Sequence, residues 1–217
     1  MFNLDAASTI SRIVTLLIAF TIHEFSHAWV ADRFGDSTPR MNGRLTLNPI
    51  AHIDPIGALL LIFAGFGWAK PVPINPYALR RHSRSAVMWV SLAGPLSNLV
   101  LAILGSAAFL LVWNPAGDMA LSVNNFLPTP VGFLYYFIII NLSLMVFNLL
   151  PIFPLDGEKV LDFLLPPNGQ DFLASIRPYG SIILLVVVFL LPYLGINILG
   201  SILNPLISTW LNVLLGG

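Results

Sequence analysis

The chain has 217 residues, of which 57% are hydrophobic and only 9% are charged. A soluble domain usually carries about 25% charged residues, so this balance favours a membrane protein with the lipid bilayer as its surroundings. Ten basic residues offset ten acidic ones, and no polybasic run suggests a nucleic-acid partner. Cysteine is absent, which excludes disulfides and thiolate metal sites.

The first long apolar stretch, from about Ser8 to Val30, contains an H-E-x-x-H sequence at residues 23–27. On a helix, residues i and i+4 share one face, so His23 and His27 can hold one zinc ion together. Glu24 lies about 100° round the helix from His23 and can reach a water molecule at that metal. Ionisable side chains are costly at membrane depth, which favours a functional metal site over a chance match.

Later apolar stretches predict further membrane helices. Ile56 to Trp68 is short for a crossing and is typical of a re-entrant or tilted short helix, whereas Ala86 to Trp113 and Val131 to Leu150 are clear spans. The stretch from Ser181 to Leu215 suits two short spans joined near residues 192–195, or one span followed by an interfacial segment. We therefore expect an all-α polytopic membrane protein, a bundle of about five to six transmembrane or re-entrant helices.

Two segments predict a small membrane-associated β element. Gly43 to Asn48 alternates loosely between polar and apolar residues, and Lys70 to Asn75 is proline-rich and extended. Together they are expected to form a small sheet that dips toward the membrane and is protected there by protein. An edge of such a sheet would bind a substrate stretched into β form through main-chain hydrogen bonds.

Basic residues orient the chain. Seven of the ten Lys and Arg residues lie between Arg33 and Arg84, whereas the connection from Asn114 to Pro130 has none. By the positive-inside rule, the first connection is cytoplasmic and the second is external. The first span then ends in the cytoplasm just after His27, and the span at residues 131–150 returns to that side. We expect a multi-pass cell-membrane protein with its site toward the cytoplasm.

A polar cluster at the predicted cytoplasmic end of that later span, residues 148–157, contains a candidate third metal ligand. Two histidines leave a catalytic zinc needing one more protein ligand and an open position. Asp156 is the best candidate, because the predicted topology places it at the same membrane face as His27. Pro151 and Pro154 break the helix, so that the chain can turn the carboxylate inward. Asn148 precedes the break and can donate hydrogen bonds to a substrate carbonyl or a developing oxyanion.

Four other polar residues have two interpretations each. His52 and Asp54 could bind the metal, although their loop position beside prolines favours a turn. Asn98 lies on a span rich in small residues, where close helix packing is favoured over a place in the active-site chamber. Asn141 lies seven residues before Asn148 and fits either a polar path or an interhelical hydrogen bond.

The two motifs together resemble the site-2 proteases, a family of intramembrane zinc metalloproteases. That family combines H-E-x-x-H in one transmembrane helix with a distant Asn…Pro…Leu-Asp-Gly motif in a later one, here residues 23–27 and 148–157. The resemblance implies three zinc ligands, namely His23, His27 and Asp156. It also implies that Glu24 is the general base and that Asn148 positions the substrate.

Further runs extend the resemblance to about residues 10–162 and are similar to the compact bacterial branch. They are residues 43–49, 52–57, 67–73 and 93–98. One departure follows the second motif, where many relatives have a second glycine and a basic residue but this chain has Glu158 and Lys159. Relatives with an added PDZ or CBS module are longer, so we expect a single transmembrane metalloprotease domain over residues 1–217.

The resemblance implies hydrolysis of peptide bonds in or near transmembrane segments of membrane proteins. A helical substrate hides its carbonyls in i to i−4 hydrogen bonds and must unwind before attack. Two alternatives stay open at this point. A metal-ion transporter or channel would use the same His, Glu and Asp side chains to bind a passing ion, and a catalytically silent scaffold would only bind membrane proteins.

Overall fold

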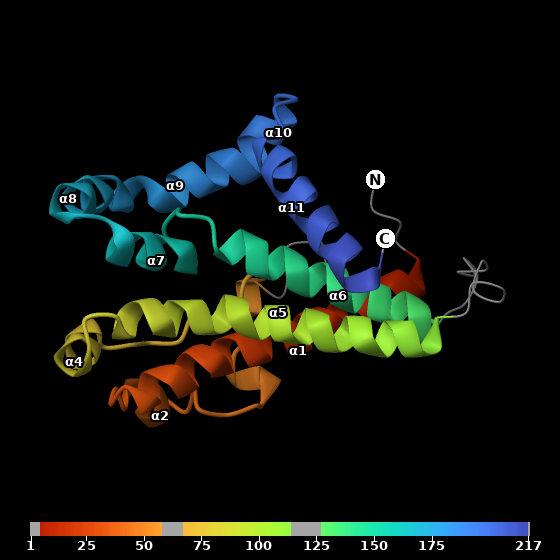
Figure 1. The fold of residues 1–217 in the computed structure, drawn as a ribbon, viewed down its shortest axis with the longest axis horizontal. Coiled ribbons are helices and arrows are strands. Elements are labelled where there is room, and N and C mark those ends of the chain that lie inside the picture. The colour runs from red at the N-terminus through yellow and green to blue at the C-terminus, as the bar shows by residue number, and fades with distance from the viewer. Residues whose placement is uncertain (1–4, 58–66, 114–126, 217) are drawn as a thin grey trace.

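The computed structural model describes residues 5–57, 67–113 and 127–216 (Figure 1). In this part of the chain, five helical stretches are long and apolar enough to cross a membrane. They are α1 (Ala6–Arg33), α5 (Ala86–Val112), α6 (Pro130–Asn148), the stretch Pro167–Tyr193 and α11 (Ile198–Leu215). The prediction of an all-α polytopic membrane protein is therefore confirmed.

Helices α1, α5 and α6 pack side by side and form the central bundle (Figure 1). Between α5 and α6 lies an apolar core that includes Ala102, Ile138 and Leu142, all fully buried. Helix α1 buries small side chains such as Ser11 and Ala19, which allow close approach between membrane helices. The bundle thus brings residues 75 positions apart in the sequence into contact, as between α1 and α5.

Helix α6 ends at Asn148, and a turn over residues 149–155 leads into α7 (Asp156–Leu164), as the two prolines in this segment predict. Gly157 lies so close to the turn that a Cβ atom there would collide with the carbonyl oxygens of Leu149 and Leu150. The glycine therefore lets the first turn of α7 pack directly against the end of α6. This packing places Asp156 beside the bundle.

In the described part of the connection from α1 to α5, short helices include α2 (Thr38–Met41), η1 (Pro49–Ala51) and α4 (Pro76–His82). The predicted sheet between residues 43–48 and 70–75 does not form, since the described residues contain only an isolated antiparallel bridge between Ile53 and Ala69. The carbonyl groups of residues 70 and 71 accept hydrogen bonds from the side chain of Arg44 and not from a neighbouring strand. Residues 58–66 lie outside the described part, and with them most of the predicted re-entrant segment.

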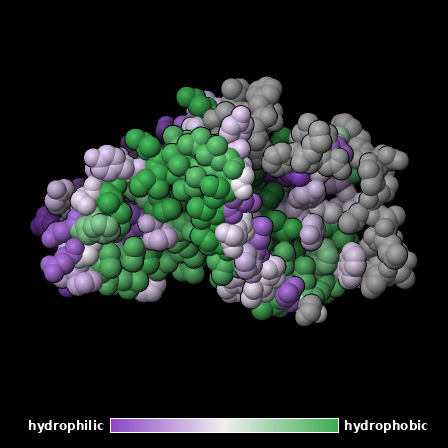
Figure 2. Space-filling view, turned by 90° about the horizontal axis from the view of Figure 1, so that it is seen from above, coloured by the Kyte–Doolittle hydropathy of each residue, from purple (hydrophilic) through white to green (hydrophobic). Residues whose placement is uncertain are grey.

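The C-terminal part is a helical hairpin. Its first arm, residues 167–193, runs through α8 (Pro167–Ile176), η2 (Arg177–Tyr179), α9 (Gly180–Leu185), the π-helical η3 (Val186–Leu190) and α10 (Leu191–Tyr193). The chain breaks over residues 194–197, with Gly195 at a φ of 80°, and returns as α11, which packs against α6 (Figure 1). Both arms are long and apolar enough to cross a membrane, as the two-span alternative expects, and Figure 2 shows the broad apolar surface seen from the hairpin side.

Candidate metal centre

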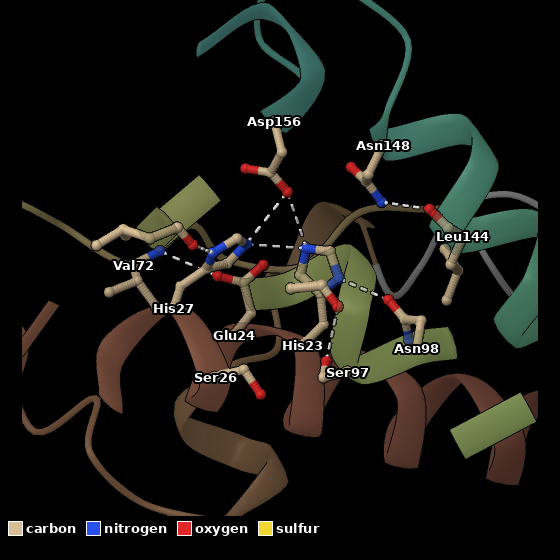
Figure 3. A network of polar contacts seen from close by, with 12 residues as sticks. His23, Glu24, Ser26, His27, Val72, Ser97, Asn98, Leu144, Asn148 and Asp156 are labelled. Atoms are coloured by element: carbon tan, nitrogen blue, oxygen red, sulfur yellow. Dashed lines mark hydrogen bonds and ion pairs between the residues drawn. The ribbon is translucent and has the colours of Figure 1, made fainter. Parts of the chain in front are cut away.

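Three side chains from two helices converge at one point (Figure 3). The Nε2 atoms of His23 and His27, one helical turn apart on α1, are 3.0 Å from each other. Each lies 3.2 Å from Oδ2 of Asp156, the first residue of α7. No other group of three His, Asp or Glu side chains in the described part of the chain converges in this way. The structure therefore brings together the three residues expected as metal ligands.

The spacing of these atoms fits a tetrahedral zinc ion. Zinc bonds of about 2.0–2.1 Å place neighbouring ligand atoms about 3.3 Å apart in a tetrahedron. Two imidazoles and one carboxylate, with a fourth position left open, are also the ligand set of many catalytic zinc sites. His23, His27 and Asp156 would hold the ion.

Both imidazole rings are held in the orientation that metal binding requires. His23 Nδ1 lies 2.6 Å from Oδ1 of Asn98, and His27 Nδ1 lies 2.6 Å from the carbonyl oxygen of Val90. These oxygens only accept hydrogen bonds, so each Nδ1 carries the proton and each Nε2 presents its lone pair to the metal position. Helix α5 therefore sets the tautomer of both histidines.

Asn98 belongs to a buried chain of amides that joins the three central helices. Its Nδ2 donates to Oδ1 of Asn141 at 3.0 Å, and Nδ2 of Asn141 donates to the carbonyl oxygen of Phe137 at 2.8 Å. Both asparagines are fully buried. The packing interpretation favoured for Asn98 was incomplete, because its carbonyl oxygen also orients His23. For Asn141, the structure shows the interhelical hydrogen bond.

Gly94 on α5 lies directly against the metal-binding atoms. A Cβ atom at this position would collide with Nε2 of both His23 and His27. The absence of a side chain thus makes room for the two rings and for an ion between them. Sequence reasoning assigned no such role to Gly94, although the run at residues 93–98 was part of the family resemblance.

Glu24 is buried beside the two imidazoles, as Figure 3 shows. Its Oε2 accepts a hydrogen bond of 3.1 Å from the backbone N–H of Val72. Asn148, the last residue of α6, is less closely tied to the site. Its amide nitrogen donates to the carbonyl oxygen of Leu144 at 3.0 Å, and so to its own helix.

His52 and Asp54 do not join the metal ligands. His52 is buried, and its Nε2 lies 2.8 Å from the carbonyl oxygen of Thr46. Oδ1 of Asp54 accepts hydrogen bonds from the backbone N–H groups of Ile56 and Gly57, at 3.0 and 2.9 Å. Both residues therefore stabilise turns, as their position beside prolines indicated.

Comparison with known proteins identifies the family. The model of "Peptidase family M50" matches residues 11–191. The chain belongs to this peptidase family. It is 42% identical over 192 residues to the "Putative zinc metalloprotease YwhC" of Bacillus subtilis, a match that covers 88% of this chain and 85% of that protein. No solved structure matches the chain.

Longer relatives occur in mycobacteria. The "Putative zinc metalloprotease Rip2" of Mycolicibacterium smegmatis is 37% identical over 176 residues, which cover 78% of this chain and 63% of that protein. The Rip2 protein of Mycobacterium tuberculosis strain H37Rv is 36% identical over 185 residues, covering 82% of this chain and 66% of that protein.

Membership of family M50 confirms the resemblance to the site-2 proteases. The protein is an intramembrane zinc metalloprotease of the multi-pass type, and zinc is its cofactor. The alternatives of a metal-ion transporter and of a silent scaffold are not favoured by these relationships.

Proposed function

We propose that His23, His27 and Asp156 hold the catalytic zinc and that Glu24 is the general base for peptide-bond hydrolysis. The observation that carries this proposal is the convergence of the three ligand atoms within 3.2 Å of one another at the C-terminal half of α1. Glu24 lies next to His23 in the sequence and is buried with it. The site therefore combines a metal position with a carboxylate that can accept a proton.

Bound zinc would lower the pKa of a water molecule and polarise the scissile carbonyl group. Glu24 takes the proton of the attacking water and later delivers it to the leaving amine. Asn98 and the Val90 carbonyl hold the two imidazoles in place throughout.

Asn148 is proposed to position the substrate. An amide nitrogen carries two N–H groups, and the hydrogen bond to Leu144 uses one of them. The second can donate to a substrate carbonyl that has lost its helical partner, or to the oxyanion that develops on it. The bond to Leu144 would keep this donor in a fixed orientation.

The proposed substrate is a transmembrane protein or peptide that reaches the site through the bilayer. The excess of basic residues between Arg33 and Arg84 supports a cytoplasmic location for the connection after α1, and hence a site open toward the cytoplasm. We take residues 1–217 to act as one transmembrane metalloprotease domain. The substrate helix must unwind near the scissile bond, because its carbonyls are otherwise hydrogen-bonded.

The decisive experiment replaces Glu24 by glutamine in the purified, zinc-loaded protein. Cleavage of a transmembrane peptide should fall by at least about 1000-fold, since the base is lost, while the zinc content stays at the wild-type value. Chelation of zinc from the wild type should abolish cleavage, and added zinc should restore it. Normal turnover by Glu24→Gln would contradict the proposal, and zinc flux into vesicles carrying the variant would favour a transporter.

A further inference from the structure

Three loop segments with no assigned role meet around one buried side chain, Arg44. They are residues 43–49, 51–57 and 67–73. The guanidinium group of Arg44 donates to the carbonyl oxygens of Ala51, Lys70 and Pro71, the last at 2.8 Å from Nη2. Arg44 is only 4% exposed, so it is not an ordinary surface cation.

A second set of contacts fixes the same segment from its backbone. The N–H of Lys70 donates to the carbonyl oxygen of His52 at 2.8 Å, and Ile53 pairs with Ala69 in the antiparallel bridge. Further along, the N–H of Asn75 donates to the carboxylate of Asp36 at 2.6 Å. Residues 69–75 therefore have a defined path past the metal centre.

Val72 is the point where this segment touches the catalytic machinery. Pro71 and Pro73 have no N–H group, so Val72 supplies the one backbone donor of the three residues. That donor bonds to Oε2 of Glu24 at 3.1 Å. The carbonyl of Pro71, which Arg44 binds, belongs to the same peptide unit as the N–H of Val72.

This shared peptide unit couples Arg44 to Glu24. In a planar trans peptide the C=O and N–H groups point in opposite directions, so a cation bound to the oxygen fixes where the N–H points. Hydrogen bonds in such a chain also polarise one another and strengthen. Burial lowers the pKa of the Arg44 guanidinium, and the charge of Glu24 acts in the opposite direction. The arrangement stabilises a buried carboxylate that would otherwise lose its hydration.

We propose that Arg44 and Val72 are positioning residues for Glu24. Arg44 holds the peptide unit between Pro71 and Val72. The N–H of Val72 then occupies Oε2 of Glu24, so that Oε1 of Glu24 faces the attacking water. This inference rests on the proposed function, in which Glu24 is the general base. It gives the three loop segments one common task, which is to orient that base from outside the zinc ligand set.

The first test removes the single N–H. Val72→Pro deletes the donor in a segment that already has proline on both sides, and Val72→Ala removes the side chain while keeping the donor. Any decrease of kcat in Val72→Ala measures the contribution of the side chain. The further decrease of kcat in Val72→Pro measures the contribution of the N–H group. We expect kcat of Val72→Pro to fall about 10- to 100-fold below that of Val72→Ala, somewhat less than for loss of an oxyanion donor. KM should change by less than about twofold and zinc content should not change.

Two further variants keep the test valid if Val72→Pro folds poorly. Replacing the Pro71–Val72 peptide bond by an ester, through the α-hydroxy analogue of valine, removes the N–H with almost no change in shape. Arg44→Lys keeps the charge, but a single ammonium group lacks the planar fork that reaches several carbonyls. We expect kcat to fall about tenfold in both, again at full zinc occupancy.

Each contrary result has a distinct meaning. Unchanged kcat in the ester variant would overturn the proposal. Parallel loss of zinc and activity would show that Arg44 only supports the folded site, and a rise of KM alone would show that the segment binds substrate. The wild type and Glu24→Gln are measured in the same assay. Absence of zinc-dependent cleavage by the wild type would refute the proposed function itself, whereas active wild type with unaffected Arg44 and Val72 variants would refute only this inference.

Discussion

The central bundle and the C-terminal hairpin are similarly apolar, yet they are buried in different ways. Within the most apolar stretch, 33% of residues are buried by protein in each of α1, α5 and α6, against 11% in residues 167–193 and 0% in α11. The bundle interior also buries polar side chains such as Thr15, Asn98 and Asn141, whereas the hairpin presents mainly apolar side chains outward.

The comparison shows what polar residues do in membrane helices. Lipid is as apolar as leucine, so apolar composition alone does not decide which helices pack together. Buried amides and ionisable groups do, because each needs a partner inside the protein. We therefore expect functional effects to concentrate in the bundle and at its contact with α7, and four predictions test this expectation.

Asp156→Ala should have the largest effect, because Asp156 on α7 is the one ligand that comes from outside the bundle. Loss of one of three ligands should weaken zinc affinity by more than about 100-fold, which exceeds the effect of losing a hydrogen-bond partner of a ligand. Activity should fall together with the zinc content. Metal analysis of the purified protein measures the effect. The matched control is Asp54→Ala, which loses only hydrogen bonds within a turn and should keep its zinc. Loss of zinc from Asp54→Ala but not from Asp156→Ala would show that the third ligand is misassigned.

Asn148→Ala should reduce cleavage more than it reduces zinc content. Loss of one donor to a carbonyl or oxyanion costs about 100-fold in rate. Substrates with Gly or Pro near the scissile bond should partly rescue the variant, because less unwinding is left to stabilise. Zinc stoichiometry and cleavage of matched helical and helix-broken peptides would be measured together. Loss of zinc in proportion to activity would assign Asn148 to the metal site, and no change in either would make it a packing residue.

Asn98→Ala should weaken zinc binding by about 10- to 100-fold, the usual effect of losing the partner of a metal-binding histidine. Asn98→Asp keeps an oxygen acceptor for His23 and should bind zinc more tightly than Asn98→Ala. Competition with a chelator of known affinity gives both values. Equal affinities in the wild type and Asn98→Ala would show that the contact at 2.6 Å does not orient the ring.

The smallest effect is expected in the hairpin. Val213 on α11 is 70% exposed in the protein, so Val213→Ala should change the free energy of unfolding by less than about 0.5 kcal/mol. Leu142→Ala in the fully buried core of α6 should cost about 2–5 kcal/mol. Reversible unfolding in mixed micelles can compare the two. Equal losses would mean that the hairpin packs as tightly as the bundle.

The sequence alone determined the features that depend on local geometry. An i, i+4 spacing places His23 and His27 on one face of any helix, so their pairing needed no knowledge of the fold. Long apolar stretches predict membrane helices by the thickness of the bilayer, and the family motifs pointed to Asp156. The proline-broken turn before Gly157 was also predictable, because proline cannot continue the hydrogen-bond ladder of a helix.

Only the tertiary structure decided which distant groups meet. The contact of Asn98 with His23 joins residues 75 positions apart, and that of Val72 with Glu24 joins residues 48 positions apart. Gly94 likewise makes room for two rings that lie far from it in the sequence. In place of the expected sheet, the side chain of Arg44 binds the carbonyl groups of residues 70 and 71. Which donor pairs with a buried acceptor depends on how distant segments pack, and no periodicity along the chain records that packing.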